Sequence, residues 1–258
     1  MNQKKLCWGL LSTARINRRL IPPLRKSPRN TLVAVASRDI ERAQQYAREW
    51  NIPIAFGSYE ELLEDPKIDI VYISLPNSLH AAWTVKALQA GKHVLCEKPL
   101  ATTLQDVDAI IQASRQTGKV ALEAFMYRHH AQTLKVKELV ENGAIGELRL
   151  VKGAFSFYLD QPENVRLIAS LDGGCLWDVG CYPVSYARYL AGAEPVEAFG
   201  WQITGSSGVD IHFTGQLHFP NNVFAQFDSS FCTTFRTSIE VVGSTGSIII
   251  PKPYVPSP

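Results

Sequence analysis

The chain lacks the patterns that mark metal, nucleic-acid and membrane proteins. Its five cysteines form no Cys-x-x-Cys pair and no zinc-type spacing with histidine. The 26 basic and 24 acidic residues leave a net charge of +2 with no lysine-arginine block, which argues against nucleic acid or an anionic membrane surface as a partner. No run of about 18 apolar residues occurs, and the first apolar stretch is too short for a signal peptide. We therefore expect a cytoplasmic protein with no metal site and with reduced, buried thiols.

The first half of the sequence alternates two kinds of apolar pattern. Short apolar runs predict strands at 6–11, 31–36, 54–56, 68–75, 93–96 and 120–122, and helical spacing predicts helices at 39–50, 78–91 and 103–118. Strands that alternate with helices of this length predict βαβ units and a parallel sheet.

The pattern changes after residue 126. One more helix is expected at 133–142, and the chain then becomes rich in strand patterns at 148–157, 196–204, 209–219, 223–231, 237–242 and 248–250. A helix at 178–190 is the exception. The fold class is therefore a nucleotide-type α/β domain over 1–125, followed over 126–258 by an open, mostly antiparallel sheet domain.

The turn after the first strand is short of glycine. In a dinucleotide fingerprint, small residues let backbone N–H groups approach a pyrophosphate at a helix N-terminus. Here the glycine positions fall on Ser12, Ala14 and Asn17, so the motif is weak, although the hydroxyls of Ser12 and Thr13 could bind phosphate. The following helix contains Pro22-Pro23 and is expected to break or kink there.

The second strand ends in Ser37-Arg38, where folds that prefer NAD usually place an acidic residue. A hydroxyl and a guanidinium suit a 2′-phosphate through charge-assisted hydrogen bonds, which favours NADP over NAD. Asp39 is better placed as the N-cap of the next helix. The alternative is an exposed arginine that merely precedes a helix.

Glu97-Lys98-Pro99 directly follows a buried strand. Ligands of open α/β sheets bind at the carboxyl ends of their strands, so Lys98 is a candidate for chemistry. A solvated charge at a strand end is the alternative. Asn77 and His80 follow the neighbouring strand, and the histidine could equally be structural.

In the second half, Asp178 and Tyr182 stand four residues apart after Gly173-Gly174. This spacing puts a carboxylate and a phenol on one face of a helix. The same face could be ordinary surface.

Together these motifs resemble the glucose–fructose oxidoreductase / inositol dehydrogenase (Gfo/Idh/MocA) family, and most closely its branch of NADP-dependent D-xylose dehydrogenases and dimeric dihydrodiol dehydrogenases. The resemblance runs nearly end to end. It depends on residues 8–16, Ser37-Arg38, Pro76-Asn77 with His80, Glu97-Lys98-Pro99, 123–130, Asn164 with Arg166, and 178–182.

The resemblance implies an NADP-binding Rossmann domain and a second domain that serves the substrate and oligomer formation. The residues it assigns to the cofactor are Ser12, Thr13, Ala14, Arg15, Ile16, Ser37, Arg38, Leu75, Pro76, Asn77, His80, Glu97, Lys98 and Arg128. Those it assigns to the substrate are Phe155, Asn164, Arg166, Asp178 and Tyr182, with Arg128 beside them and with Phe157 and Tyr158 as aromatic walls. It also implies a cis bond between Lys98 and Pro99.

The implied catalytic residues are Lys98 and Tyr182, with Asp178 beside them. Oxidation of a sugar or cyclic-diol hydroxyl needs a base for the O–H proton. A free tyrosine has a pKa of about 10 and needs a nearby cation to act as that base, a role we assign to Lys98. The expected protein is an NAD(P)-dependent dehydrogenase that acts on CH–OH groups.

Two other functions fit the same resemblance. A non-catalytic sugar sensor would not need Lys98, Asp178 and Tyr182 together, and an NAD-dependent glycoside hydrolase conflicts with Ser37-Arg38. Family members usually continue beyond the point where this chain ends in a proline-rich stretch at 251–258. We therefore expect a truncated second sheet, and a homo-oligomer through that sheet if it is complete.

Overall fold

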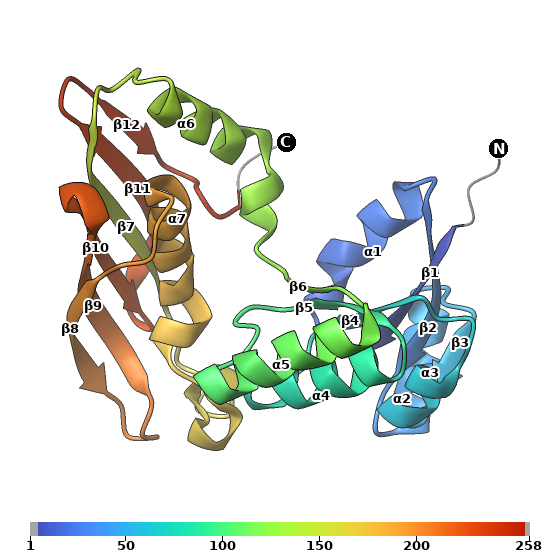
Figure 1. Cartoon of the computed structure of the whole chain (residues 1–258). Coiled ribbons are helices and arrows are strands. Elements are labelled where there is room, and N and C mark those ends of the chain that lie inside the picture. The colour runs from blue at the N-terminus through green and yellow to red at the C-terminus, as the bar shows by residue number, and fades with distance from the viewer. Residues whose placement is uncertain (1–4, 256–258) are drawn as a thin grey trace. The chain divides into compact units, whose positions relative to one another are not determined.

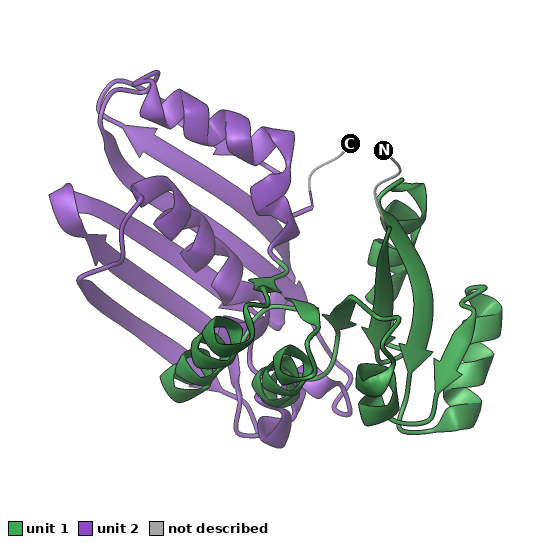
Figure 2. Cartoon of the chain, turned by 45° about the vertical axis from the view of Figure 1, so that its right-hand side comes forward, with its two compact units in different colours: residues 1–124 green, residues 125–258 purple. Residues whose placement is uncertain are grey.

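The computed structural model describes residues 5–255. The chain falls into two compact units, residues 1–124 and 125–258 (Figure 2). Each unit has its own β-sheet and its own hydrophobic core. Among the described residues, no helix is both long and apolar enough to cross a membrane.

The described part of the first unit is built on a six-stranded parallel sheet in the order β3-β2-β1-β4-β5-β6 (Figure 1). Its strands are β1 (Leu6–Leu11), β2 (Asn30–Ala36), β3 (Ile54–Phe56), β4 (Ile70–Ile73), β5 (His93–Cys96) and β6 (Ala121–Glu123). The order reverses between β1 and β4, and this reversal is the point where doubly wound sheets bind nucleotides. The predicted parallel sheet is confirmed.

Helices bury both faces of this sheet. They are α1 (Asn17–Lys26), α2 (Ile40–Glu49), α3 (Tyr59–Glu64), α4 (Asn77–Gln89) and α5 (Leu104–Thr117). Side chains of α1 and α2 pack in one apolar cluster and those of α3, α4 and α5 in another, so successive strand residues such as Leu10 and Leu11 point to opposite cores. Fully covered parallel strands read as continuous apolar runs, which is the pattern of the sequence.

One sequence signal in these helices is confirmed and another is not. Asp39 caps α2 as predicted, because its carboxylate accepts the N–H of Glu41 at 2.9 Å. The expected break at Pro22-Pro23 is wrong, since α1 stays helical to Lys26. Buried Ile21 and Leu24 flank the two prolines and anchor the helix to the sheet, so tertiary packing outweighs the lost backbone hydrogen bonds.

The second unit carries a mixed, mostly antiparallel sheet, with six strands among the described residues in the order β12-β11-β7-β10-β9-β8. Its strands are β7 (Leu148–Tyr158), β8 (Glu197–Thr204), β9 (Asp210–Phe219), β10 (Val223–Ser230), β11 (Cys232–Gly243) and β12 (Ser247–Ile250). Only the β7–β10 pair is parallel among them. The predicted open sheet is confirmed.

Two helices and several short turns complete this unit. The helices are α6 (Ala131–Glu141) and α7 (Cys181–Ala191), and the short helical segments are η1 (Met126–His129), η2 (Val165–Leu167), η3 (Ala169–Leu171), η4 (Leu176–Gly180) and η5 (Pro220–Asn222). Side chains of α6 and α7 pack in the main apolar cluster with one face of the sheet. The predicted helix at 178–190 is therefore two elements, a π-helical turn η4 that runs directly into α7.

The structure gives no support to the expected truncation of this sheet. β12 pairs with β11, and the segment after it returns to the core, where Tyr254 is 1% exposed. The Tyr254 ring stacks on Phe155 with centroids 5.0 Å apart. Within residues 251–255, Tyr254 thus contributes to the core.

The prediction of uniformly buried thiols is also wrong. All five cysteines are free, Cys96 and Cys175 are buried, but Cys232 is exposed at the start of β11. Periodicity placed Cys232 in an apolar run, whereas the register of β11 bulges at its beginning and leaves that residue at the surface.

Candidate functional site

The predicted cofactor residues of the first unit gather at the carboxyl edge of its sheet. Ser12 follows β1, Ser37 follows β2, Leu75 lies two residues beyond β4 and Glu97 follows β5. These four strands are parallel neighbours, so the loops after them share one edge. This edge contains the reversal between β1 and β4, where open α/β sheets bind their ligands.

The β1–α1 turn is held by side chains in place of glycines. Ser12 adopts φ 128°, a backbone conformation that glycine adopts most readily. The Ser12 hydroxyl accepts the Ala14 N–H at 3.1 Å and lies 2.8 Å from the hydroxyl of Ser74. Fully buried Asn17 accepts the Ser74 hydroxyl at 2.7 Å and donates its amide to the Ser12 carbonyl at 2.8 Å.

Both hydroxyls of the turn make hydrogen bonds within the protein. Ser12 Oγ is engaged inside the turn, and Thr13 Oγ1 accepts a hydrogen bond from Arg42 Nε at 2.9 Å. Arg15 and Ile16 at the start of α1 are exposed, and a helix N-terminus is a favourable place for an anion. The first turn of α1 has no acidic residue to repel an anion.

The end of β2 presents Arg38 to the surface. Ser37 is 7% exposed and its hydroxyl accepts the Asp39 N–H at 3.3 Å, so it supports the loop from within. Arg38 lies on the rim of a hollow of about 370 Å³ that is also lined by Tyr59, Leu79 and Trp83. A cation beside two aromatic rings is a suitable surface for a phosphorylated nucleoside.

Lys98 leaves the sheet at the end of β5, and the Lys98–Pro99 bond is cis, as the resemblance implied. Glu97 beside it accepts a short hydrogen bond from the hydroxyl of Tyr72 on β4. Cys96 lies one residue earlier, fully buried, and burial raises the pKa of its thiol far above the ordinary value. A buried thiol and a hydrogen-bonded carboxylate thus directly precede the lysine.

His80 fastens two loops of this edge together. It is 1% exposed, its Nδ1 lies 2.7 Å from the carbonyl of Pro99, and its Nε2 lies 2.7 Å from the carbonyl of Leu75. Burial lowers the pKa of the imidazole. The ring nitrogens therefore face protein carbonyls, which supports the structural alternative for this residue and not a direct contact with a cofactor.

In the second unit, Asp178 and Arg166 form an ion pair. Arg166 Nε donates to Asp178 Oδ2 at 2.6 Å, and the aspartate side chain is only 13% exposed. The Asn164 side chain accepts the Arg166 N–H at 3.2 Å. A Cβ atom at Gly173 would lie 2.4 Å from the Arg166 carbonyl, so the glycine permits this approach of the two loop segments. The structure thus brings together three of the predicted substrate residues.

Tyr182 lies in the first turn of α7 within an aromatic cluster. It is 7% exposed, and its ring centroid lies 5.4 Å from those of Phe125 and Phe155 and 5.2 Å from that of Tyr254. The start of α7 thus holds the phenol ring against three aromatic side chains.

Of the remaining predicted residues of this unit, Arg128 and Phe157 pack inside it, whereas Tyr158 does not. Arg128 donates to the Ser185 carbonyl at 3.3 Å, with its guanidinium 5.4 Å from the Tyr189 ring centroid. Phe157 packs against Phe231 with centroids 5.2 Å apart, whereas Tyr158 is 70% exposed. Tyr158 therefore projects into solvent on the described unit.

Sequence reasoning missed three residues that shape these sites. Asn17 was noted only as a position without glycine, and only the structure shows that its side chain is buried. Ser74 lies 57 residues from its partner Asn17, and Asp210 contacts the start of η4 across 34 residues. No local pattern identifies partners at such separations.

Comparisons with known proteins agree with this architecture. Residues 8–125 match the oxidoreductase family with an NAD-binding Rossmann fold, and residues 133–249 match the GFO/IDH/MocA C-terminal domain. The D-xylose 1-dehydrogenase (NADP(+)) 2 of Haloferax volcanii is 40% identical over 229 residues, which cover 88% of this chain and 70% of that protein. The trans-1,2-dihydrobenzene-1,2-diol dehydrogenase of Xenopus tropicalis is 32% identical, over 95% of this chain and 75% of its own.

Solved structures give the same result. The aldose-aldose oxidoreductase of Caulobacter crescentus in complex with glycerol superposes with a TM-score of 0.91 at 31% identity, over 99% of this chain and 79% of that chain. The 3-ketoreductase of Actinomadura kijaniata in complex with NADP and TDP-benzene superposes with a TM-score of 0.90 at 31% identity, over 98% and 78%. That ketoreductase has also been solved as a lysine-to-alanine variant and as a tyrosine-to-phenylalanine variant.

The fold and the carboxyl-edge site define an oxidoreductase of the dinucleotide-binding class. The chain belongs to the Gfo/Idh/MocA family, whose Rossmann domain binds NAD(P). These comparisons favour neither the non-catalytic sugar sensor nor the glycoside hydrolase that the resemblance left open.

Proposed function

We propose that this protein is an NADP-dependent dehydrogenase or reductase that transfers a hydride between the nicotinamide and a hydroxyl or carbonyl carbon of a sugar or cyclic diol. The observation that carries the proposal is the constellation of Asp178, paired with Arg166, and Tyr182 on the next helical turn, in a chain of this family. Relatives are named for D-xylose, a dTDP-sugar and a dihydrodiol, which supports this substrate class.

Arg38 supports NADP as the cofactor. It stands where an acidic residue would hold the ribose hydroxyls of NAD, and the hollow beside it is lined by Tyr59 and Trp83. The loss of a charge-assisted hydrogen bond of about 1.5–3 kcal/mol corresponds to roughly 10- to 150-fold in affinity. Arg38→Ala should weaken NADPH binding by that factor and leave NADH binding within about twofold, as measured by fluorescence titration. Equal loss for both cofactors would refute the 2′-phosphate role.

The proposed chemistry assigns one task to each polar group. When bound, the nicotinamide gives or takes the hydride. Tyr182 moves the hydroxyl proton of the substrate, and Lys98 provides the positive charge that favours its phenolate and hydrogen-bonds the substrate oxygen. Asp178, held by Arg166, orients a neighbouring substrate hydroxyl. The choice of a lysine and a tyrosine agrees with the two variants made in the Actinomadura ketoreductase.

The test combines a substrate panel with two matched variants. Purified protein is incubated with NADP⁺ and pentoses, hexoses and cyclic diols while NADPH absorbance is recorded. Tyr182→Phe should reduce turnover by about 10²–10⁴-fold with NADPH binding intact, because general acid–base catalysis contributes that much. Tyr254→Phe is the matched control, because it removes the hydroxyl of a second tyrosine in the same aromatic cluster and should keep turnover.

Two outcomes would contradict the proposal. A wild-type chain that binds NADPH but reduces NADP⁺ with no member of the panel, and oxidises NADPH with none of the corresponding carbonyl compounds, is not the proposed enzyme. Unchanged turnover in Tyr182→Phe would refute the role of the tyrosine while leaving the dehydrogenase intact.

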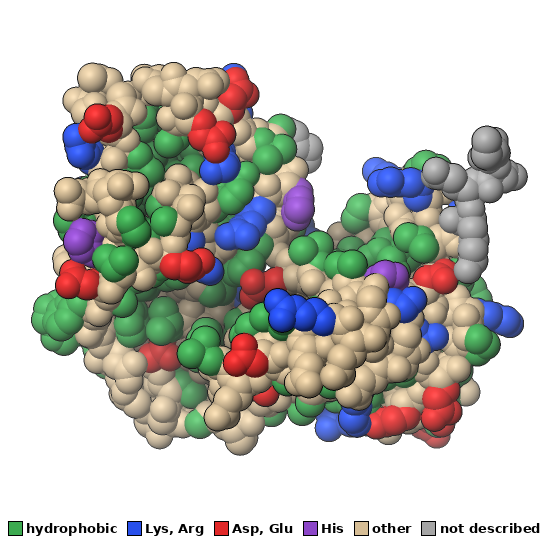
Figure 3. Space-filling model, viewed as in Figure 1, with side chains coloured by type: hydrophobic (Ala, Val, Ile, Leu, Met, Phe, Trp, Pro, Cys, Tyr) green, Lys and Arg blue, Asp and Glu red, His purple; other side chains and the backbone are tan. Residues whose placement is uncertain are grey.

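The open face of the second sheet is the proposed surface for a homo-oligomer. Strand β8 exposes Phe199, Trp201 and Ile203, each more than half accessible, and hydrophobic side chains gather at this edge of the sheet (Figure 3). The same face carries the ion pairs Lys152–Glu240 and Arg236–Asp228, whose mixed charges can complement those of a second copy. Light scattering should show a dimer or higher oligomer that Trp201→Glu dissociates. A monomeric wild type would refute this surface.

A further inference from the structure

We infer that Asp210 is a positioning residue for the proposed active site, because its carboxylate fixes the start of the helical segment that carries Asp178 and Tyr182. The inference rests on the proposed function. Asp210 begins β9 and so lies on the rigid sheet, whereas η4 and α7 follow a loop. A contact between them determines where the helix begins.

Two hydrogen bonds connect Asp210 to the helix start. Its Oδ2 accepts the Leu176 N–H at 2.7 Å and the Cys175 S–H at 3.0 Å. Leu176 is the first residue of η4, and its N–H is one of the donors that a helix N-terminus leaves without an intrahelical partner. No side chain of the residue before η4 caps this turn, so the cap comes from a strand 34 residues away. A carboxylate at this position also interacts favourably with the helix dipole.

A glycine makes room for this contact. Gly174 adopts φ 120°, and a Cβ atom there would lie 2.1 Å from Asp210 Oδ1. Both the backbone conformation and the space therefore require glycine. The Gly173-Gly174 pair serves two contacts, since Gly173 admits the Arg166 carbonyl and Gly174 admits the Asp210 carboxylate. One loop thus positions both members of the Arg166–Asp178 ion pair.

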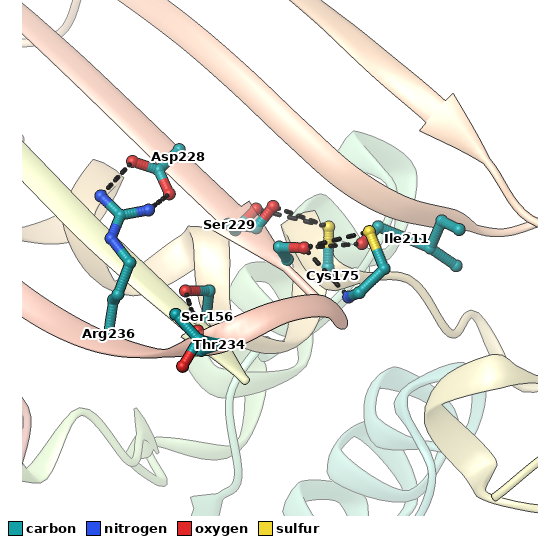
Figure 4. A network of polar contacts seen from close by, with 9 residues as sticks. Ser156, Cys175, Ile211, Asp228, Ser229, Thr234 and Arg236 are labelled. Carbon is teal, nitrogen blue, oxygen red and sulfur yellow. Dashed lines mark hydrogen bonds and ion pairs between the residues drawn. The ribbon is translucent and has the colours of Figure 1, made fainter. Parts of the chain in front are cut away.

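Cys175, the residue before η4, contacts a second strand of the sheet. Cys175 is fully buried, and Figure 4 shows its sulfur facing Ser229 on β10. The Ser229 hydroxyl lies 3.5 Å from the Cys175 sulfur, and a Cβ atom at Gly180 would lie 2.8 Å from the same hydroxyl. Burial, and then the adjacent Asp210, raise the pKa of the Cys175 thiol, so it remains an uncharged hydrogen-bond partner. The turn between Leu176 and Gly180 is therefore held from two strands.

The turn that Asp210 caps is π-helical. Single π-helical turns inside longer helices frequently mark functional sites. Asp178 lies two residues and Tyr182 six residues after the capped N–H, so a shift of the helix start moves both groups. A misplacement of about 1 Å in a catalytic group can reduce turnover by about 10²-fold.

The experiment compares Asp210→Ala with Asp210→Asn, using Thr103→Ala as the control. Thr103 caps α5 in the first unit, where its hydroxyl accepts the Asp106 N–H at 3.1 Å, and it has no proposed role in the reaction. At saturating NADP⁺, Asp210→Ala should lower kcat at least about tenfold, and Asp210→Asn should recover most of it because its amide oxygen still accepts the Leu176 N–H. The KM for NADP⁺ should stay within about twofold in both, and Thr103→Ala should keep its kcat. Equal kcat in Asp210→Ala and wild type would overturn the inference.

Hydrogen exchange provides a readout that does not require turnover. Amides of peptides that span residues 175–183 should exchange faster in Asp210→Ala than in wild type, and Asp210→Asn should restore their protection. Unchanged exchange refutes the inference even if the wild type proves inactive on every substrate, so failure here differs from failure of the proposed function. If Asp210→Ala does not fold, Gly174→Ala displaces the same carboxylate, and the same two measurements decide.

Discussion

The buried hydroxyl of Tyr254 allows a direct test of how the core of the second unit is packed. The side chain is 1% exposed, and its hydroxyl has no hydrogen-bond partner among residues 5–255. A buried polar group without a partner reduces stability by about 1–3 kcal/mol. Tyr254→Phe keeps the ring that stacks on Phe155 and opens no cavity, so the free energy of unfolding should rise by about that amount. For a protein of this size the thermal midpoint should rise by about 2–12 °C.

The pH dependence of this gain has a definite sign. Burial raises the pKa of Tyr254 well above 10, so the unfolded chain loses this proton at a lower pH than the folded chain. Stability is therefore complete below pH 10 and falls as the pH rises above it. Tyr254→Phe removes this loss, and its advantage should grow between pH 9 and pH 11. Burial also raises the pKa of Tyr127, and that of Tyr186 to about 12. The Tyr254→Phe protein therefore still loses some stability at alkaline pH.

The assay is thermal unfolding followed by fluorescence and by circular dichroism, at pH 7, 9 and 11. Tyr158→Phe is the matched control, because that side chain is 70% exposed and its substitution should change stability by less than about 0.5 kcal/mol. A Tyr254→Phe protein less stable than wild type would show that the hydroxyl has a partner and would refute the reasoning. An advantage that shrinks in alkali would refute the assigned direction of the pKa.

Three further predictions concern packing and protonation. Burial lowers the pKa of His80, so its contribution to the free energy of unfolding is complete above pH 6.5 and is lost as the pH drops through the folded pKa. In urea titrations at pH 5–7, His80→Gln should reduce this loss of stability in acid. A variant that loses as much stability in acid as the wild type would contradict this. Asn17→Ala removes the acceptor of the Ser74 hydroxyl, so it should lower the free energy of unfolding by about 1–3 kcal/mol. It should also weaken NADPH binding in a fluorescence titration. Unchanged NADPH binding would show that Asn17 does not support a cofactor-binding turn. Gly153→Ala places a Cβ atom 2.5 Å from Pro183 Cβ and should lower the free energy of unfolding by about 1–3 kcal/mol. An unchanged free energy of unfolding would show that α7 can move away from β7 without loss of stability.

The sequence by itself determined the architecture of both units. Apolar runs and helical spacing identified the six strands of the first sheet and the helices α2, α4 and α5 to within a few residues, because burial imposes a pattern on the chain. Helix α3 was not predicted, and α1 was expected to break or kink at its two prolines. Arg38 and Lys98 were found as candidates because parallel strands place their carboxyl ends at one edge, whatever the side chains that surround them. The catalytic and binding roles of these residues remain predictions.

Only the tertiary structure decided which side chains support the sites. Asn17 meets Ser74 across 57 residues and Asp210 meets Leu176 across 34, and these separations carry no periodic signal. The same holds for Tyr254, whose local sequence is rich in proline and whose ring nevertheless completes an aromatic core. Local sequence encodes period and propensity, whereas a hydrogen bond or a ring stack between distant segments exists only once the sheet has set their distance.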